Sequence, residues 1–213
     1  MATATTAPTP ERLPLQLDQV APAPARRPRV VLVGSALASV ASIALLGSVL
    51  AVYFSVRADW LAESGEAWLP MGATIPLSPG NMSMVTLAMS LVTVQWAVWS
   101  GGRRDRAHAY LALGLTVVLG IAHVVQLAYL WTQWELPLNG SEVTAQAVLL
   151  FTVLGLHVAM VAGALIFLTL MLLRSLGGQF TGRDVEGLSA AALYWYVTVA
   201  LFTVIWYGIL IVK

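Results

Sequence analysis

Residues 144–173 read TAQAVLLFTVLGLHVAMVAGALIFLTLMLL and contain no Asp, Glu, Lys or Arg. About 20 apolar residues in a helix span a bilayer core of about 30 Å, so this stretch is long enough to cross a membrane. Stretches of the same character lie at 30–56, 82–100, 107–132 and 188–212. The sequence therefore predicts an all-α integral membrane protein whose residues 29–213 form a bundle of five transmembrane helices.

Composition narrows the chemistry that the chain can perform. Hydrophobic residues make up 59% of the 213 residues and charged residues only 10%, which is more apolar than a water-soluble domain. Cysteine is absent, which excludes disulfides, thiolate metal sites and cysteine nucleophiles. The few, scattered arginines argue against nucleic-acid binding. Residues 1–28 are rich in Ala and Pro and predict a disordered tail.

Charge differs between alternate connections of the predicted helices. Arginines lie before the first stretch (Arg26, Arg27 and Arg29) and between the second and third (Arg103, Arg104 and Arg106). Two more, Arg174 and Arg183, lie between the fourth and fifth stretches. The other two connections hold carboxylates: Asp59, Glu63, Glu66, Glu135 and Glu142. By the positive-inside rule, the N-terminal tail is expected to be cytoplasmic and the C-terminus external.

Small residues recur at every fourth position in two of the stretches. They are Gly34, Ala38 and Ser42 in the first, and Gly155, Ala159 and Gly163 in the fourth. Such rows allow two helix backbones to approach closely. We expect these faces to be buried by packing within the bundle, and the alternative is a docking surface for another subunit.

Two histidines have a possible chemical role. His123 and His157 fall at similar depth in the third and fourth stretches, so they could hold a haem iron from both sides, as in a haem b electron carrier. The alternative is that each imidazole makes a hydrogen bond to a neighbouring helix. No catalytic residue or metal site of another kind is predicted.

Polar and sulfur-containing side chains mark the second stretch. The polar ones are Ser83, Thr86, Ser90, Thr93 and Gln95, and Gln126 lies in the third stretch. Hydroxyls and amides do not take up protons near neutral pH, so we interpret this set as interhelical hydrogen bonds rather than a proton path. Met82 and Met84 point to different sides of a helix, and gap filling is favoured over a copper site.

The chain from Val30 to Lys213 resembles subunit III of cytochrome c oxidase, and the last two stretches carry the specific signature. The family's penultimate helix is matched at Gly155, His157, Val161, Gly163 and Arg174, and its final helix at Gly187, Tyr194 and Trp195. We take Gly155, His157, Gly163, Gly187, Tyr194 and Trp195 as signature packing residues. Ionisable residues of the family are replaced by neutral ones at Ser42, Met160, Ser189, Tyr196 and Val199.

The resemblance implies a non-catalytic subunit III of an aerobic respiratory oxidase, in its five-helix form from a bacterial plasma membrane. Such a subunit packs on subunit I and holds phospholipid in a cleft between helices one and two and the other three. Haem a and copper are then expected in partner subunits, with none in this chain, and the usual intramembrane carboxylates are lost. Candidate lipid-binding residues are Arg174, Arg183 and Trp195. A subunit III-like accessory protein of a nitric oxide reductase is an alternative.

Overall fold

Five long helices make up the computed structural model, which describes residues 29–70, 73, 75–134, 136, 143–178 and 185–212. They are α1 (Val30–Ser64), α2 (Leu77–Gly102), α3 (Arg106–Thr132), α4 (Ala145–Leu176) and α5 (Glu186–Ile205), and α5 continues into the π-helix η2 (Trp206–Ile211). All five are long and apolar enough to cross a membrane, which confirms the predicted fold class. The tail 1–28 and Arg183 lie outside the described residues.

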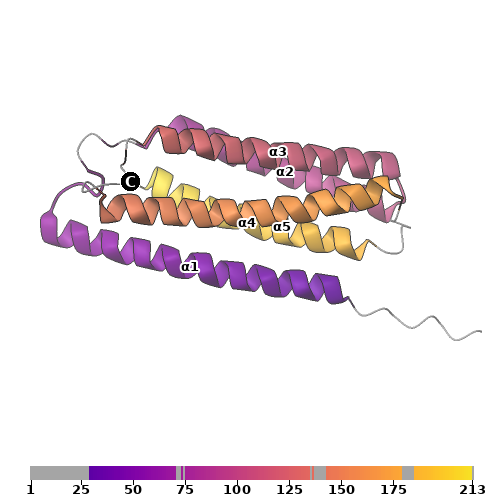
Figure 1. Ribbon diagram of the computed structural model, residues 1–213, viewed down its shortest axis with the longest axis horizontal. Helices are drawn as coiled ribbons and strands as arrows, with labels where there is room; N and C mark the ends of the chain where they lie inside the picture. The colour runs from indigo at the N-terminus through magenta and orange to yellow at the C-terminus, as the bar shows by residue number, and fades with distance from the viewer. Residues whose placement is uncertain are drawn as a thin grey trace, which may run out of the picture.

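The helices lie lengthwise beside one another (Figure 1). α2 packs most extensively on α3, α4 packs on α3 and α5, and α1 packs on α5 and α4. Among the described residues α1 and α2 do not contact each other, although both pack on α5. The expected arrangement, with the first two helices set apart from the other three by a cleft, is therefore wrong for this chain.

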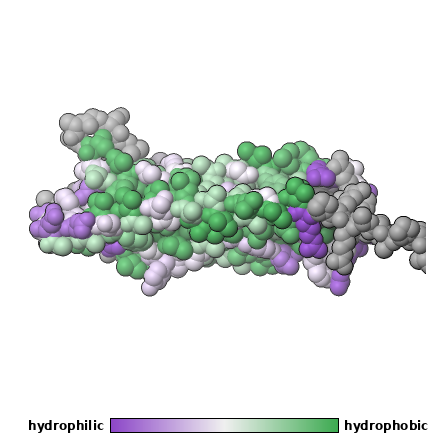
Figure 2. Space-filling model, turned by 90° about the horizontal axis from the view of Figure 1, so that it is seen from below, coloured by the Kyte–Doolittle hydropathy of each residue, from purple (hydrophilic) through white to green (hydrophobic). Residues whose placement is uncertain are grey.

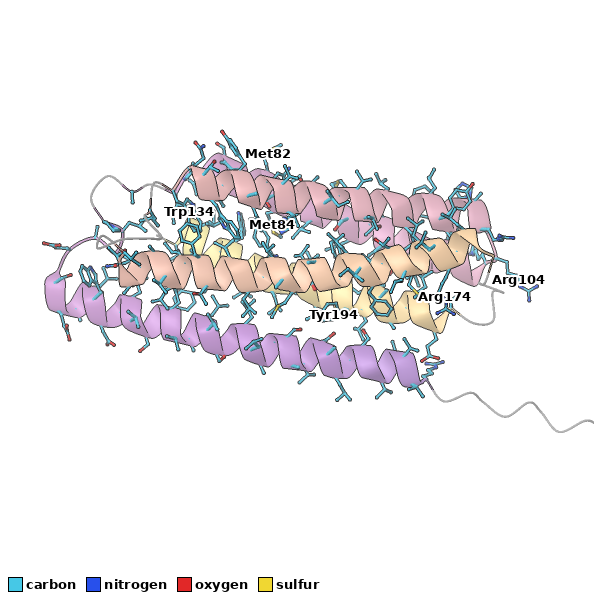
Figure 3. All side chains as sticks on the ribbon, in the orientation of Figure 1. Met82, Met84, Arg104, Trp134, Arg174 and Tyr194 are labelled. Atoms are coloured by element: carbon cyan, nitrogen blue, oxygen red, sulfur yellow. The ribbon has the colours of Figure 1, made fainter. Side chains whose placement is uncertain are left out.

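On the face seen in Figure 2, the bundle is apolar along its length and polar at both ends. Side chains such as Val40, Val118 and Ile166 are 64%, 60% and 64% exposed, as expected of residues that face lipid. One end, here called the basic end, carries Arg29, Arg103, Arg104, Arg106 and Arg174. Figure 3 shows Arg104 and Arg174 at this end.

The opposite end of α1 shows a difference from the predicted boundaries. The sequence suggested a helix ending near residue 56, but α1 continues to Ser64 and is capped by Gly65 in the left-handed conformation, with φ of 64°. Its 35 residues span about 52 Å, well beyond a bilayer core of about 30 Å. Asp59 and Glu63 are therefore helical residues, at what we call the acidic end.

Hydrogen bonds join α1 to α5 along their shared seam. The Ser35 hydroxyl donates to the carbonyl of Ala190 at 2.6 Å. The Ser42 and Tyr194 hydroxyls lie 3.1 Å apart, within hydrogen-bond distance. At the basic end the backbone N–H of Leu32 donates to the Glu186 carboxylate at 3.0 Å. Glu186 thus accepts a hydrogen bond from one of the free N–H groups in the first turn of α1. Its negative charge is also favourable near the positive, N-terminal ends of the α1 and α5 dipoles.

Gly120 sets the closest approach between α3 and its neighbours. A Cβ added there would lie 2.5 Å from Cδ2 of Leu165 and 2.7 Å from Cη2 of Trp195. Gly114, six residues earlier on α3, has no neighbouring atom of the described residues within 4 Å of an added Cβ. The first glycine is therefore required by packing, and the second is not.

We expect Gly120→Ala to lower the free energy of unfolding by about 1–3 kcal/mol, because the added methyl overpacks the contact with α4 and α5. The matched change Gly114→Ala should leave stability unchanged or raise it by about 0.5–1 kcal/mol. Circular dichroism during SDS titration of the purified chain measures both. Equal effects of the two substitutions would contradict this packing.

Candidate functional site

The two membrane histidines meet in the bundle interior. Nε2 of His123 lies 3.3 Å from Nε2 of His157, and Nδ1 of His123 lies 2.7 Å from the Ser83 hydroxyl. The Phe202 ring stacks on His157 at 5.1 Å between centroids and packs edge-on against His123 at 4.7 Å. Both imidazoles are fully buried. The cluster joins α2, α3, α4 and α5 at one point.

This geometry does not fit a haem iron held between the two imidazoles. A metal–nitrogen bond to histidine is about 2 Å, so opposite axial nitrogens stand about 4 Å apart with the porphyrin plane between them. The 3.3 Å contact between the two Nε2 atoms is shorter than this spacing. The arrangement instead fits the alternative of an imidazole–imidazole hydrogen bond, although Nδ1 of His157 has no hydrogen-bond partner among the described residues.

The polar side chains of α2 are directed to neighbouring helices. Hydrogen bonds join Thr93 to Thr116, Thr86 to Gln126, Ser90 to Trp195, and Gln95 to Tyr196, besides the Ser83 contact with His123. The interpretation of these residues as interhelical hydrogen-bonding groups is confirmed. These polar side chains give α2 the lowest mean hydropathy of the five helices. Because they are hydrogen-bonded to other helices, α2 can still cross a membrane.

Trp195 does not lie at the lipid surface. Its side chain is fully buried, and its indole N–H donates to the Ser90 hydroxyl at 2.9 Å. The expectation that Trp195 contacts lipid is therefore wrong, because hydrogen bonding and packing against Gly120 hold the ring between helices. Trp195 is a packing residue, as the family signature implied.

The remaining signature residues have separate places. Tyr194 faces Ser42 on α1, and an added Cβ at Gly187 would lie 2.9 Å from Sδ of Met171, so this glycine is a close contact of α5 with α4. Gly155 is half-buried and Gly163 is exposed, and neither has an atom within 4 Å of an added Cβ.

The two rows of small residues are not buried as we expected. Gly34 and Ala38 on α1, and Ala159 and Gly163 on α4, are exposed. On α1 the buried positions are the neighbouring Ser35 and Ser39, one residue further along the helix. Packing within the bundle is therefore the wrong explanation for these four residues, whereas Ser42 and Gly155, the other members of the two rows, are half-buried.

The methionines and the lipid candidate Arg174 can also be placed. Met82 is 61% exposed, whereas Met84 points between the helices, where its Sδ accepts a hydrogen bond from Thr203 at 3.8 Å (Figure 3). The two sulfurs thus do not converge, in keeping with gap filling. Arg174 is exposed in the last turn of α4 at the basic end, and its Nη1 would lie 3.6 Å from a Cβ added at Gly187.

Two pockets open along α5. The basic-end pocket, of about 560 Å³, lies between α1 and α2 and includes Leu32, Ala36, Gln95, Val98, Ser189 and Tyr196. The acidic-end pocket, of about 530 Å³, lies between α1 and the end of α5 and is lined by Phe54, Thr203, Val204, Tyr207, Gly208 and Val212. Both are shallow and open to the side of the bundle.

We expect Ser83→Ala to lower the free energy of unfolding by about 1 kcal/mol, because it leaves buried Nδ1 of His123 without a partner. Ser48→Ala is the control, since the exposed Ser48 hydroxyl bonds only to the carbonyl of Leu45 in its own helix. SDS titration measures both variants. A loss for Ser48→Ala as large as that for Ser83→Ala would contradict a stabilising role of the histidine cluster.

Comparison with known proteins identifies the family. The family model for cytochrome c oxidase subunit III matches residues 29–212. The chain is 33% identical over 171 residues to "Cytochrome c oxidase subunit 3" of Formosania lacustris, covering 76% of this chain and 64% of that one. It is 31% identical over 154 residues to the protein of that name from Sus scrofa, covering 68% of this chain and 58% of the relative.

Each of these relatives is thus covered over less than two thirds of its length, whereas the family match runs through all five helices of this chain. The match confirms the extent of the resemblance, and the five apolar helices make the chain a multi-pass membrane protein. The chain belongs to the cytochrome c oxidase subunit III family.

Proposed function

We propose that this chain is the non-catalytic subunit III of an aerobic respiratory cytochrome c oxidase in a bacterial plasma membrane. It packs on subunit I, and the haem a and copper of the complex are held by partner subunits. The N-terminal tail and the basic end face the cytoplasm. Family membership and the relatives' shared name support this function, and the positive-inside rule supports the orientation.

The exposed small residues of α4 carry the proposal. Ala159 and Gly163 lie one turn apart on the outer side of the helix, with open space beyond Gly163. In lipid, helices associate through close van der Waals packing, which such residues permit. A large apolar side chain would serve as well if this face contacted only lipid. We therefore assign the face to a helix of subunit I.

The interior of the chain suits a structural role. Within the five helices, the charged residues lie near the two ends, and most polar side chains between them are paired with a neighbouring helix or with their own backbone. A proton relay requires a group that accepts and releases protons near neutral pH. Ser42, Ser189 and Tyr196 replace ionisable residues of the family with groups that do not. Proton transfer is accordingly assigned to partner subunits.

Phospholipid binding forms the second part of the proposal. Arg174 is exposed at the basic end, where a lipid phosphate lies in the adjacent headgroup layer. Arg183 is the second candidate for this phosphate. The exposed lining of the acidic-end pocket is entirely apolar. Burial of apolar surface there favours binding of an acyl chain from the leaflet opposite the basic end. No aromatic contact from Trp195 is involved.

Purification of the native complex through an affinity tag on this chain tests the assembly. In mild detergent, we expect subunit I and its haem absorption to be recovered in stoichiometric amount. Ala159→Leu should lower this recovery about tenfold, because overpacking one helix contact by a few kcal/mol is enough for that change. Ala128→Leu, at an exposed alanine on α3, is the matched control.

Recovery of the chain alone, or together with a nitric oxide reductase, would refute the proposed assembly. Equal recovery with Ala159→Leu and Ala128→Leu would refute the docking face on α4 but leave the assembly itself standing.

The lipid site is tested by Arg174→Gln. We expect this variant to retain about fivefold less anionic phospholipid than the wild type, because one cation near an anionic headgroup contributes about 1 kcal/mol. Native mass spectrometry of the purified full chain measures retained lipid. Arg174→Lys, which keeps the positive charge, is the control. Unchanged lipid retention in Arg174→Gln would contradict the assignment.

A further inference from the structure

The basic-end pocket contains an amide that faces the bilayer. Gln95 is exposed on α2, although it lies in a membrane-spanning helix. The Tyr196 hydroxyl on α5 donates a hydrogen bond to Oε1 of Gln95, which fixes the direction of the amide. Nε2 of Gln95 makes no hydrogen bond to any residue that the structure describes. Its two N–H groups are therefore directed outward without a protein acceptor.

The depth of Gln95 makes this exposure costly. Gln95 lies seven residues before Gly102, the last residue of α2, and the helix has 26 residues. At about 1.5 Å per residue, α2 is about 39 Å long. Centred in a hydrocarbon core of about 30 Å, it extends about 4–5 Å beyond the core at each end. Gln95 is then about 6 Å inside the hydrocarbon, below the lipid headgroups. An amide N–H without an acceptor is unfavourable there, so a bound acceptor would stabilise it.

The lining of the pocket defines the chemistry of that acceptor. Among the described residues that line it there is no Arg or Lys, so this lining offers no partner for an anionic phosphate. Its polar side chains are the neutral Gln95, Ser189 and Tyr196, and the rest of the lining is apolar. A volume of about 560 Å³ is in the range of small-molecule sites, which are mostly apolar with a few placed polar groups. The lining thus suits a neutral carbonyl head with a hydrocarbon tail.

We propose that the basic-end pocket binds a lipid-soluble quinone. One ring carbonyl accepts a hydrogen bond from Nε2 of Gln95, the ring lies against Tyr196 and Val98, and the apolar tail leaves through the open side of the pocket. Tyr196 is a positioning residue, because it holds the amide through Oε1. The proposal concerns binding only and involves no electron transfer.

The site is separate from the surfaces used in the proposed function. No residue of α4 lines the pocket, whereas the docking face and Arg174 both belong to α4. Ala159→Leu should therefore leave quinone binding unchanged, and loss of quinone binding should leave assembly with subunit I unchanged. Failure of either proposal can be recognised without the other.

Photolabelling of the full chain in phosphatidylcholine nanodiscs tests the site. The probe is an azido-substituted benzoquinone with a short alkyl tail, and mass spectrometry locates the label. We expect labelled peptides to include residues near Gln95 and Tyr196, and excess decylubiquinone to suppress the labelling. Neither diolein, a neutral lipid with ester carbonyls, nor dioleoylphosphatidylglycerol should compete.

Two variants make the test specific. Gln95→Leu should reduce labelling about three- to tenfold, the value of one hydrogen bond, and Tyr196→Phe should reduce it to a smaller extent. The control is Thr152→Val, because the exposed Thr152 hydroxyl bonds only to the carbonyl of Val148 in its own helix. Equal labelling of Gln95→Leu and wild type, label spread over all five helices, or competition by diolein or phosphatidylglycerol would overturn the proposal.

Discussion

Pairing of polar groups inside a water-free bilayer determines how this bundle is arranged. α2 carries hydroxyl and amide groups along its length, and each needs a partner that lipid cannot supply. Ser83 and Thr93 find theirs on α3, while Ser90 finds its partner on α5. A single interhelical hydrogen bond contributes only about 0.6 kcal/mol. Such bonds therefore select the neighbours and register of α2, and close packing at positions such as Gly120 contributes stability.

The same constraint limits what the chain can do. Within the five helices, the Asp, Glu, Lys and Arg side chains lie near the two ends, and the two buried histidines contact each other too closely to hold a haem between them. The parts of such a bundle that can bind other molecules are therefore on its outer surface. The face of small residues on α4 offers room for another helix, and the pockets along α5 offer room for amphiphilic molecules.

The five membrane spans could be predicted because an uncharged apolar run has few alternatives to a transmembrane helix. The helix ends could not, since α1 continues beyond the hydrocarbon layer, where the apolar signal no longer applies. Spacing also revealed the small-residue rows but not what lies opposite them. The side of α1 that faces α5 carries Ser35 and Ser39, whereas Gly34 and Ala38 lie on an exposed side. Glu186 was overlooked because its partner Leu32 is 154 residues away.

The most direct test of a structural role beside subunit I is site-specific photocrosslinking in native membranes, with a benzoylphenylalanine placed at Ala159 or, as control, at Ala128. A crosslink from position 159 to the haem–copper subunit, with none from position 128, is the predicted result. Crosslinks from position 159 only to lipid, or to proteins of an unrelated complex, would contradict the account.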